Sequence, residues 1–280
     1  MHDASSTACA GAPGAVSPAG SEPLVQVQRD ARGVVTLTLN DAARFNALGS
    51  AMLAALQSAI DAVAADESAR VLILAAQGRA FCAGHDLKEM AAHSDLASHQ
   101  TLFARCSRMM LSLQKLPVPV IARVQGMATA AGCQLVAQCD LAVASSAASF
   151  ATSGIRYGLF CATPSVALVR NVPIKKAMEM LRTGDFIDAA TAPDQGLVNR
   201  VAAPEALDAA VEALVQAIVD KPRAAVAMGK ALVYQQRELG VEAAYQLAGQ
   251  TMAVNMQHAD AQEGVAAFAQ KRQPRWRAGA

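Results

Sequence analysis

Several features that mark whole classes of proteins are scarce in this chain of 280 residues. Aromatic residues make up 4% and charged residues 17%, and the formal net charge is +1. A nucleic-acid surface needs clustered Lys and Arg to neutralise phosphates, so this balance argues against one. No apolar run approaches the length of a membrane span, and we expect no segment that crosses a bilayer.

Cysteine and histidine are present without the spacing of a metal or disulfide framework. The six cysteines form no CxxC pair and lie mostly in apolar segments, which predicts buried thiols in a reducing compartment. The five histidines lack ligand-like spacing, so we predict no metal site. Residues 1–22 lack the features of a signal or transit peptide. We therefore expect a disordered tail there and a cytoplasmic protein.

A long apolar stretch, residues 117–145, predicts the centre of the fold. Its sequence is PVPVIARVQGMATAAGCQLVAQCDLAVAS. It predicts a strand at 118–124, a turn at Gly126, a helix at 130–138 and a strand at 141–145, the order of a β-α-β unit. The first N–H groups of a helix lack intrahelical acceptors and favour negative charge. The small residues of this turn either leave those groups open to a ligand or simply let helix and sheet pack closely.

A second Gly-containing loop follows a predicted apolar strand at 71–76. Residues 77–90, QGRAFCAGHDLKEM, lead from that strand into a helix. Two such turns could direct two backbone N–H groups at one point. Paired donors of this kind stabilise an oxyanion when a carbonyl is attacked or enolised.

The remaining pattern predicts an α/β protein. Alternation at 24–29 and 34–39 around a turn predicts an antiparallel hairpin, and helical periodicity appears at 48–63 and 99–116. Alternating strands and helices indicate right-handed crossovers and a mostly parallel sheet. From Ile174 onward the pattern is predominantly helical. We expect an α/β core at 23–203 and a C-terminal helical region at 204–280.

The segment AFCAGHDLKEM, followed by residues 117–145, resembles the corresponding motifs of the crotonase superfamily, the enoyl-CoA hydratase/isomerase family. The resemblance runs from about residue 24 to 276 and includes NALGSAML, FATSGIRYGLF and EGVAAFAQKRQPRW. The sequence is most similar to the enoyl-CoA hydratase domain-containing proteins. The resemblance implies a crotonase-like (ClpP/crotonase) spiral of β-β-α units with a C-terminal helical trimerisation region. It also implies a homotrimer, or a hexamer built as a dimer of trimers.

The resemblance further implies an acyl-CoA or enoyl-CoA thioester as substrate or ligand, with no permanently bound cofactor. It assigns two oxyanion-hole amides to His85 and Ala131. A positive φ at Ala131 would strain its side chain. The residues that the resemblance places against coenzyme A are Arg44, Ala47, Ala83, His85, Asp86, Leu87, Lys88, Phe268 and Lys271. For Arg44 and Lys88 a solvated surface charge is the alternative, and for Phe268 and Lys271 a basic helix end that complements its own dipole.

The sequence departs from the family at the two residues that serve as general acid and general base in a hydratase. The two glutamates of a hydratase fall at Gln134 and Gly154, neither of which titrates, and losing one such group typically costs roughly 10²- to 10⁴-fold in rate. His85 could act instead, or be turned into the coenzyme A channel or bonded to Asp86. Cys161 could be nucleophilic or an inert buried thiol.

Two classes of function therefore stay open. One is an acyl-CoA enzyme, either an enoyl-CoA hydratase-like lyase or an isomerase, thioester hydrolase or decarboxylase that uses the same enolate. The other is an acyl-CoA binding protein with little turnover.

Overall fold

The computed structural model describes residues 22–276 and centres on a six-stranded sheet in the order β1-β2-β3-β5-β7-β10. The tail expected at 1–22 lies outside the described residues except for Glu22. The strands are β1 (Val25–Arg29), β2 (Val34–Leu39), β3 (Val71–Ala76), β5 (Val120–Val124), β7 (Leu141–Ser145) and β10 (Arg200–Ala202). β1 pairs antiparallel with β2, and the remaining neighbours pair in parallel. The predicted hairpin and mostly parallel sheet are confirmed.

A second, four-stranded sheet differs from the sequence-based expectation. It consists of β4 (Ala80–Cys82), β6 (Met127–Thr129), β8 (Ser149–Ala151) and β9 (Ile187–Asp188). The sequence predicts a loop at 77–90, a direct passage from Gly126 into a helix, and only helices after Ile174; the structure has short strands in each place. Strands of two or three residues are too short for side-chain alternation to be visible in a sequence.

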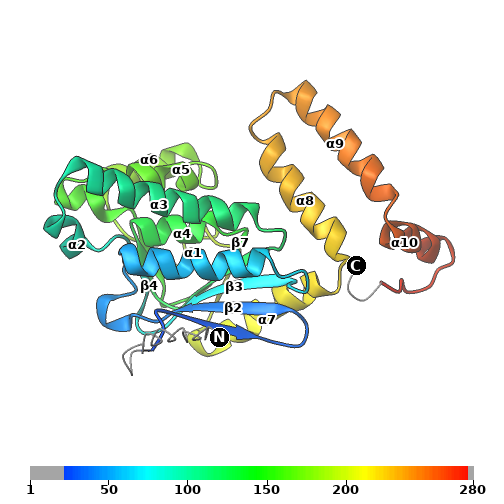
Figure 1. Ribbon diagram of the computed structural model, residues 1–280, viewed down its shortest axis with the longest axis horizontal. Coiled ribbons are helices and arrows are strands. Elements are labelled where there is room, and N and C mark those ends of the chain that lie inside the picture. The colour runs from blue at the N-terminus through cyan, green and yellow to red at the C-terminus, as the bar shows by residue number, and fades with distance from the viewer. Residues whose placement is uncertain (1–21, 277–280) are drawn as a thin grey trace, which may run out of the picture.

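Helices cover both faces of the six-stranded sheet (Figure 1). α1 (Ser50–Ala64), α3 (Leu96–Lys115) and α4 (Ala131–Gln138) lie over one face, and α7 (Leu207–Val219) lies over the other. The other helices are α2 (Leu87–Ala92), α5 (Ala162–Leu168), α6 (Ile174–Thr183), α8 (Arg223–Gln236), α9 (Val241–Met256) and α10 (Ala259–Ala269), with 3-10 turns η1 (Ala42–Arg44), η2 (Ser153–Tyr157) and η3 (Pro204–Ala206). Among the described residues, no helix combines the length and apolar character that crossing a membrane requires.

Alternation along the strands decides which helices each side chain contacts. On β2, Val35, Leu37 and Leu39 belong to the large core beneath α1, α3 and α4. The opposite face of the sheet packs on α7 through a smaller apolar cluster of Val34, Val71, Ile121, Val143, Leu207, Val211 and Val215. α7 therefore packs on the core sheet, although the predicted boundary at residue 203 assigns it to the C-terminal region. That boundary stays a prediction.

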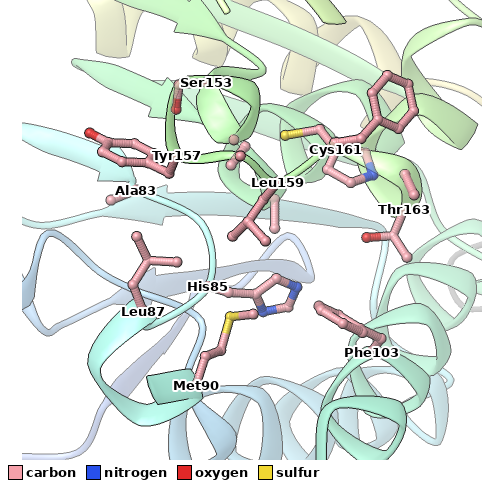
Figure 2. A pocket seen from close by; sticks show the side chains of 17 residues that line it. Ala83, His85, Leu87, Met90, Phe103, Ser153, Tyr157, Leu159, Cys161 and Thr163 are labelled. Atoms are coloured by element: carbon pink, nitrogen blue, oxygen red, sulfur yellow. The ribbon is translucent and has the colours of Figure 1, made fainter. Parts of the chain in front are cut away.

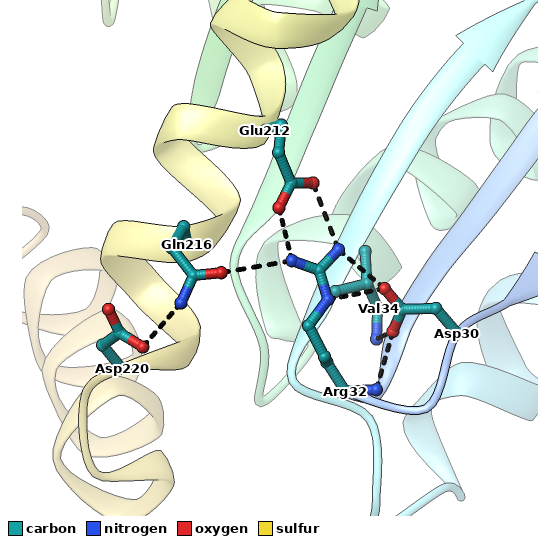
Figure 3. Close-up of polar contacts among 6 residues, drawn as sticks. All are labelled: Asp30, Arg32, Val34, Glu212, Gln216 and Asp220. Atoms are coloured by element: carbon teal, nitrogen blue, oxygen red, sulfur yellow. Dashed lines mark hydrogen bonds and ion pairs between the residues drawn. The ribbon is translucent and has the colours of Figure 1, made fainter.

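Polar contacts join the β1–β2 turn to α7 (Figure 3). Arg32 in the turn forms ion pairs with Asp30 and with Glu212 of α7, and it donates to Gln216 at 3.2 Å. Asp30 also accepts a hydrogen bond of 3.0 Å from the amide of Val34, which closes the turn. Exposed ion pairs are worth roughly 0–1 kcal/mol each. Burial of the apolar cluster, more than these contacts, therefore holds α7 on the sheet.

The α8–α9 pair extends from the body (Figure 1) and is anchored by a buried polar cluster. On α8, Lys230 lies 2.7 Å from the Asp140 carboxylate and donates to the carbonyls of Leu113 and Val118 at 2.9 and 3.0 Å. Asp140 also accepts from the hydroxyl of Tyr234 at 2.8 Å. The Lys230 side chain is 6% exposed. Because water cannot replace a lost partner at this depth, each charge depends on the other.

Replacing Lys230 with Met should lower the free energy of unfolding by about 3–5 kcal/mol, because it leaves the Asp140 carboxylate buried without its cation. The matched control is Lys176→Met, since the Lys176–Glu179 pair has side chains 53% and 62% exposed. It should cost less than about 1 kcal/mol. Denaturant unfolding of both variants measures the difference, and equal small losses would show that the buried pair does not anchor α8.

Candidate active site

Two turns of the chain meet at the carboxyl ends of β4 and β6. These strands pair in parallel, with Cys82 beside Ala128, so the loop after β4 lies next to the start of α4. Gly84 in that loop has a φ of +87°, and a Cβ built on it would lie 3.0 Å from the nitrogen of Ala131. Glycine is required there both for the backbone conformation and for the close approach.

A cavity of about 350 Å³ surrounds this contact (Figure 2). Its wall brings together four of the five residues predicted for catalysis, His85, Ala131, Gly154 and Cys161. The rest of the wall is mainly apolar, with a few hydroxyl groups, and consists of Ala83, Leu87, Met90, Phe103, Ala130, Ser153, Tyr157, Gly158, Leu159, Phe160, Ala162, Thr163 and Pro164. No Asp or Glu is among these lining residues. Sequence reasoning missed Phe103, Met90, Ser153 and Thr163, because only the tertiary structure places α2, α3, η2 and α5 around one space.

His85 and Ala131 both line this wall, although Ala131 is 0% exposed. Within residues 22–276, the hydrogen bonds of turns, loops and helix caps include none donated by the backbone amide of either residue. Ala131 is the first residue of α4, where an N–H has no intrahelical acceptor. Neither amide therefore has a backbone acceptor among the described residues.

The strained residue at this helix start is Ala130 and not Ala131. Ala130 is the N-cap of α4, with φ 52° and ψ −120°, in a region that residues with a side chain rarely adopt. Its amide donates to the carbonyl of Ala151 at 2.9 Å, and its carbonyl accepts from the amide of Gln134 at 3.1 Å. Such a conformation costs on the order of 1–3 kcal/mol. The surrounding bonds hold it and fix the start of α4 at the cavity wall.

The imidazole of His85 is hydrogen-bonded at one nitrogen only. Its Nδ1 lies 3.2 Å from the carbonyl oxygen of Leu48, and its ring meets that of Phe103 edge to face with centroids 5.3 Å apart. Nε2 is buried and has no hydrogen-bond partner among the described residues. Burial lowers the pKa of His85, opposed in part by the Leu48 bond and by Glu89. The ring is therefore neutral at pH 7.

His85 and Asp86 form hydrogen bonds with other groups and not with each other, although the sequence allows a bond between them. The Asp86 carboxylate caps α2 by accepting from the amides of Lys88 and Glu89 at 2.9 and 3.2 Å. Glu89 in turn accepts from the amide of Ser50 at 3.0 Å, at the start of α1. These caps hold the loop and α2 against α1, on one side of the cavity.

The space beside Gly154 is closed. A Cβ built there would lie 2.6 Å from the carbonyl oxygen of Leu159 and 2.8 Å from Sγ of Cys161. Gln134 is 5% exposed and lies outside the cavity wall, and its Oε1 has no partner among the described residues. Burial raises the pKa of the Cys161 thiol, partly offset by a bond to the Gly154 amide. The thiol is therefore protonated, and so weakly nucleophilic, at pH 7.

The residues predicted to contact coenzyme A fall into two groups. Ala83, His85 and Leu87 line the cavity, while Arg44, Ala47, Asp86 and Lys88 lie in or beside the same loop region without lining it. Arg44 is 63% exposed, 2.8 Å from Asp41 and 3.9 Å from Asp86. Phe268, 87% exposed, and Lys271 lie at the end of α10, which Figure 1 places at the opposite end of the molecule from α2. Within one chain they do not approach the cavity.

The described cysteines are free and buried, namely Cys82, Cys106, Cys133, Cys139 and Cys161. No group of three or more His, Cys, Asp or Glu side chains suited to a metal ion occurs within residues 22–276.

Comparison with known proteins identifies the family. The family model described as enoyl-CoA hydratase/isomerase matches residues 29–279. The chain belongs to this family. Enoyl-CoA hydratase domain-containing protein 3, mitochondrial, from Mus musculus is 46% identical over 266 residues, which cover 94% of this chain and 89% of that protein. The protein of the same name from Homo sapiens is 44% identical over 256 residues, 91% of this chain and 84% of that protein.

Solved structures of similar proteins support the same family assignment. A crystal structure of an enoyl-CoA hydratase from Mycobacterium smegmatis has a TM-score of 0.90 and 62% identity, covering 91% of this chain and 99% of that chain. That of human enoyl-CoA hydratase domain-containing protein 3 has a TM-score of 0.87 and 43% identity, covering 90% and 100%. The predicted family and crotonase fold are confirmed. The predicted cytoplasmic location is wrong, because the rat, mouse and human relatives are named as mitochondrial.

Replacing Ala130 and Ala131 with Gly, one at a time, should have opposite effects on stability. Ala130→Gly relieves a strain of roughly 1–3 kcal/mol at the cost of some chain entropy, so it should raise the free energy of unfolding by about 1 kcal/mol. Ala131→Gly relieves nothing and should lower it by up to about 1 kcal/mol. Denaturant unfolding of both variants gives the two signs. Reversed signs would place the positive φ at Ala131.

Restoring both carboxylates should fail to create a hydratase. In the Gln134→Glu/Gly154→Glu variant, the side chain introduced at position 154 would meet Leu159 and Cys161, and overpacking of this kind typically costs roughly 1–3 kcal/mol. We expect a lower Tm and no gain in hydration of crotonyl-CoA, followed by loss of the conjugated-thioester absorbance. Gln134→Glu alone is the control for stability. A gain in hydration by the double variant would show that the Gly154 region opens.

Proposed function

We propose that the protein binds an acyl-CoA thioester and stabilises its enolate between the amides of His85 and Ala131. The observation that supports this most directly is the close approach of Gly84 to the start of α4, because it brings His85 and Ala131, whose amides have no backbone acceptor, to one cavity. An enolate oxygen carries developing negative charge, and fixed N–H donors in a site shielded from water stabilise that charge strongly. Membership of the enoyl-CoA hydratase/isomerase family supports a thioester as the ligand.

The proposed reaction class is that of the family, with hydratase-like lyase activity as its first member. Hydration requires one group to accept a proton from water and one to handle the proton at the α-carbon. Gln134 and Gly154 occupy the positions at which the resemblance places those groups. An isomerase, thioester hydrolase or decarboxylase that uses the same enolate is compatible with the two amides. The lack of a carboxylate among the lining residues favours a second candidate, an acyl-CoA binding protein with little turnover.

Binding of coenzyme A is proposed to extend from the cavity along residues 83–88, with Arg44 and Ala47 alongside. Arg44 is exposed enough to meet phosphate. Within one chain, Phe268 and Lys271 lie too far from the cavity to contact a bound coenzyme A. We therefore assign their contacts to the coenzyme A bound by a neighbouring subunit of a homotrimer or hexamer. Exposed apolar side chains on α9 and α10 support such an assembly, for example Tyr245, Met252 and Phe268, which are 77%, 64% and 87% exposed.

Gly84→Ala tests the two-amide site, with Gly158→Ala as its control. Both glycines have positive φ and both additions strain the backbone, but the new methyl at Gly158 meets nothing within 4 Å, whereas at Gly84 it meets Ala130 at 2.9 Å. Calorimetric titration should show crotonyl-CoA binding more tightly than free coenzyme A to the unchanged protein. Gly84→Ala should reduce that preference about tenfold, the equivalent of one or two lost hydrogen bonds of roughly 0.5–1.5 kcal/mol each to the neutral carbonyl. Gly158→Ala should reduce it much less.

The same samples distinguish the two candidate functions. Binding without loss of the conjugated-thioester absorbance favours the binding protein. Rapid hydration would refute the argument from Gln134 and Gly154. If crotonyl-CoA binds no better than free coenzyme A, the proposed thioester site is wrong.

A further inference from the structure

The imidazole of His85 lines the cavity but has no part in the two-amide site. We propose that His85 is the base of this site, and that the protein moves a proton within an acyl thioester instead of adding water to it. This inference rests on the proposed binding of a thioester. It adds a catalytic side chain and narrows the reaction to enolisation and double-bond shift.

The hydrogen-bond geometry defines the tautomer. A carbonyl oxygen only accepts, so the 3.2 Å contact with Leu48 places the proton of neutral His85 on Nδ1. Nε2 then carries the lone pair. Phe103 packs against the ring and limits its rotation. A backbone acceptor that fixes the tautomer in this way leaves the other nitrogen ready to accept a proton.

Nε2 is a buried acceptor that no described residue satisfies. Buried polar atoms in proteins are nearly always hydrogen-bonded, and each exception needs a reason. Figure 2 shows the imidazole projecting into the cavity between Met90 and Phe103. Less than 1 Å² of Nε2 is accessible, so a ligand that supplies the missing partner must displace the side chains that cover this atom.

The position suits the α-carbon of a thioester held by the amides. The main-chain N–H and the imidazole belong to the same residue, and the α-carbon of a thioester is two bonds from its carbonyl oxygen. A thioester whose oxygen accepts from the His85 amide can be oriented with its α-carbon toward the imidazole. Holding the base and the reacting carbon in one geometry is itself a large part of catalysis.

The step needs one base and no second group. Nε2 takes the α-proton, the C–H electron pair forms a double bond to the carbonyl carbon, and the carbonyl π pair moves onto the oxygen between the two amides. The imidazolium then returns a proton. If the imidazolium first exchanges its proton with solvent, return to the α-carbon places a solvent hydrogen there. Return to the γ-carbon converts a 3-enoyl thioester into a 2-enoyl thioester. Atoms and charge balance, and no carboxylate is required.

The other titratable groups of the cavity wall suit this step less well. Burial keeps the Cys161 thiol protonated by raising its pKa. Tyr157 is 70% exposed at the rim. Glu89 acts on the pKa of His85, and the ring of His99 packs on Phe103. The elements around His85 also carry other ionisable side chains, among them Asp86, Lys88, Arg105, Cys106, Arg108, Arg156, Tyr157 and Cys161.

Deuterium exchange tests the inference. Butyryl-CoA is incubated with the protein in D₂O, and mass spectrometry follows deuterium at the α-carbon, beside calorimetry of butyryl-CoA binding. His85→Asn keeps the main-chain amide and an N–H donor for Leu48 but has no titratable acceptor. We expect binding within about threefold and exchange slowed by roughly 10²- to 10⁴-fold. His99 does not line the cavity, and its Nε2 lies 3.2 Å from the carbonyl oxygen of Met90. The His99→Asn variant therefore removes a neighbouring imidazole and should exchange at the unchanged rate.

The pH profile gives an independent readout. Burial lowers the pKa of His85 from 6.5, so the base is present at pH 7, and exchange should fall only as the pH drops through values below 6.5. His85→Asn should lose this acid limb. The conversion of but-3-enoyl-CoA to crotonyl-CoA should show the same dependence.

The outcomes separate the two proposals. No binding of butyryl-CoA overturns the thioester site and this inference together. Binding without exchange overturns the inference alone. Exchange that persists in His85→Asn, or that shows no acid limb below pH 6.5, also rejects His85 as the base while the thioester site stands.

Discussion

The close approach of two main-chain segments, Gly84 and the start of α4, is the constraint on which the rest of the site depends. It requires missing side chains on both sides. A Cβ on Gly84 would lie 3.0 Å from the nitrogen of Ala131, and one on Gly132 would lie 2.0 Å from the carbonyl oxygen of Cys82. The small second sheet supplies the register for this contact, because it pairs β4 with β6. The strain at Ala130 is the local consequence, and the bonds to Ala151 and Gln134 hold it in place.

The site differs from a family hydratase in shape as well as in chemistry. There is no room for a side chain at Gly154, because the Leu159 carbonyl and the Cys161 thiol occupy the space where its Cβ would lie. The same segment supplies the apolar roof of the cavity. At Gly154, one of the two positions where the resemblance predicts a glutamate, the packing of residues 154–161 therefore leaves no room for a side chain. The enclosed part of the wall holds two ionisable groups, the Cys161 thiol and an imidazole whose second nitrogen has no hydrogen-bond partner among the described residues.

Sequence reasoning succeeded where the physical signal is long and periodic. β3 and β7 match their predicted limits, since apolar runs and alternation of five or six residues are distinctive. It failed at β4 and β6, where three residues carry no period. The resemblance named four residues that the fold gathers in one cavity, although their roles stay predictions. It could not identify Phe103 or the Leu48 carbonyl, because these reach His85 only through the packing of distant elements.

The helix α4 connects the cavity with the C-terminal helices. It begins at Ala131 on the cavity wall, and two residues past its end Asp140 binds Lys230 and Tyr234 of α8. The same carboxylate accepts from the amide of Val120 at the start of β5 at 2.7 Å. Packed helices and strands shift as units because protein interiors have little free volume. One short, almost fully buried helix therefore joins the cavity wall to the carboxylate that anchors α8.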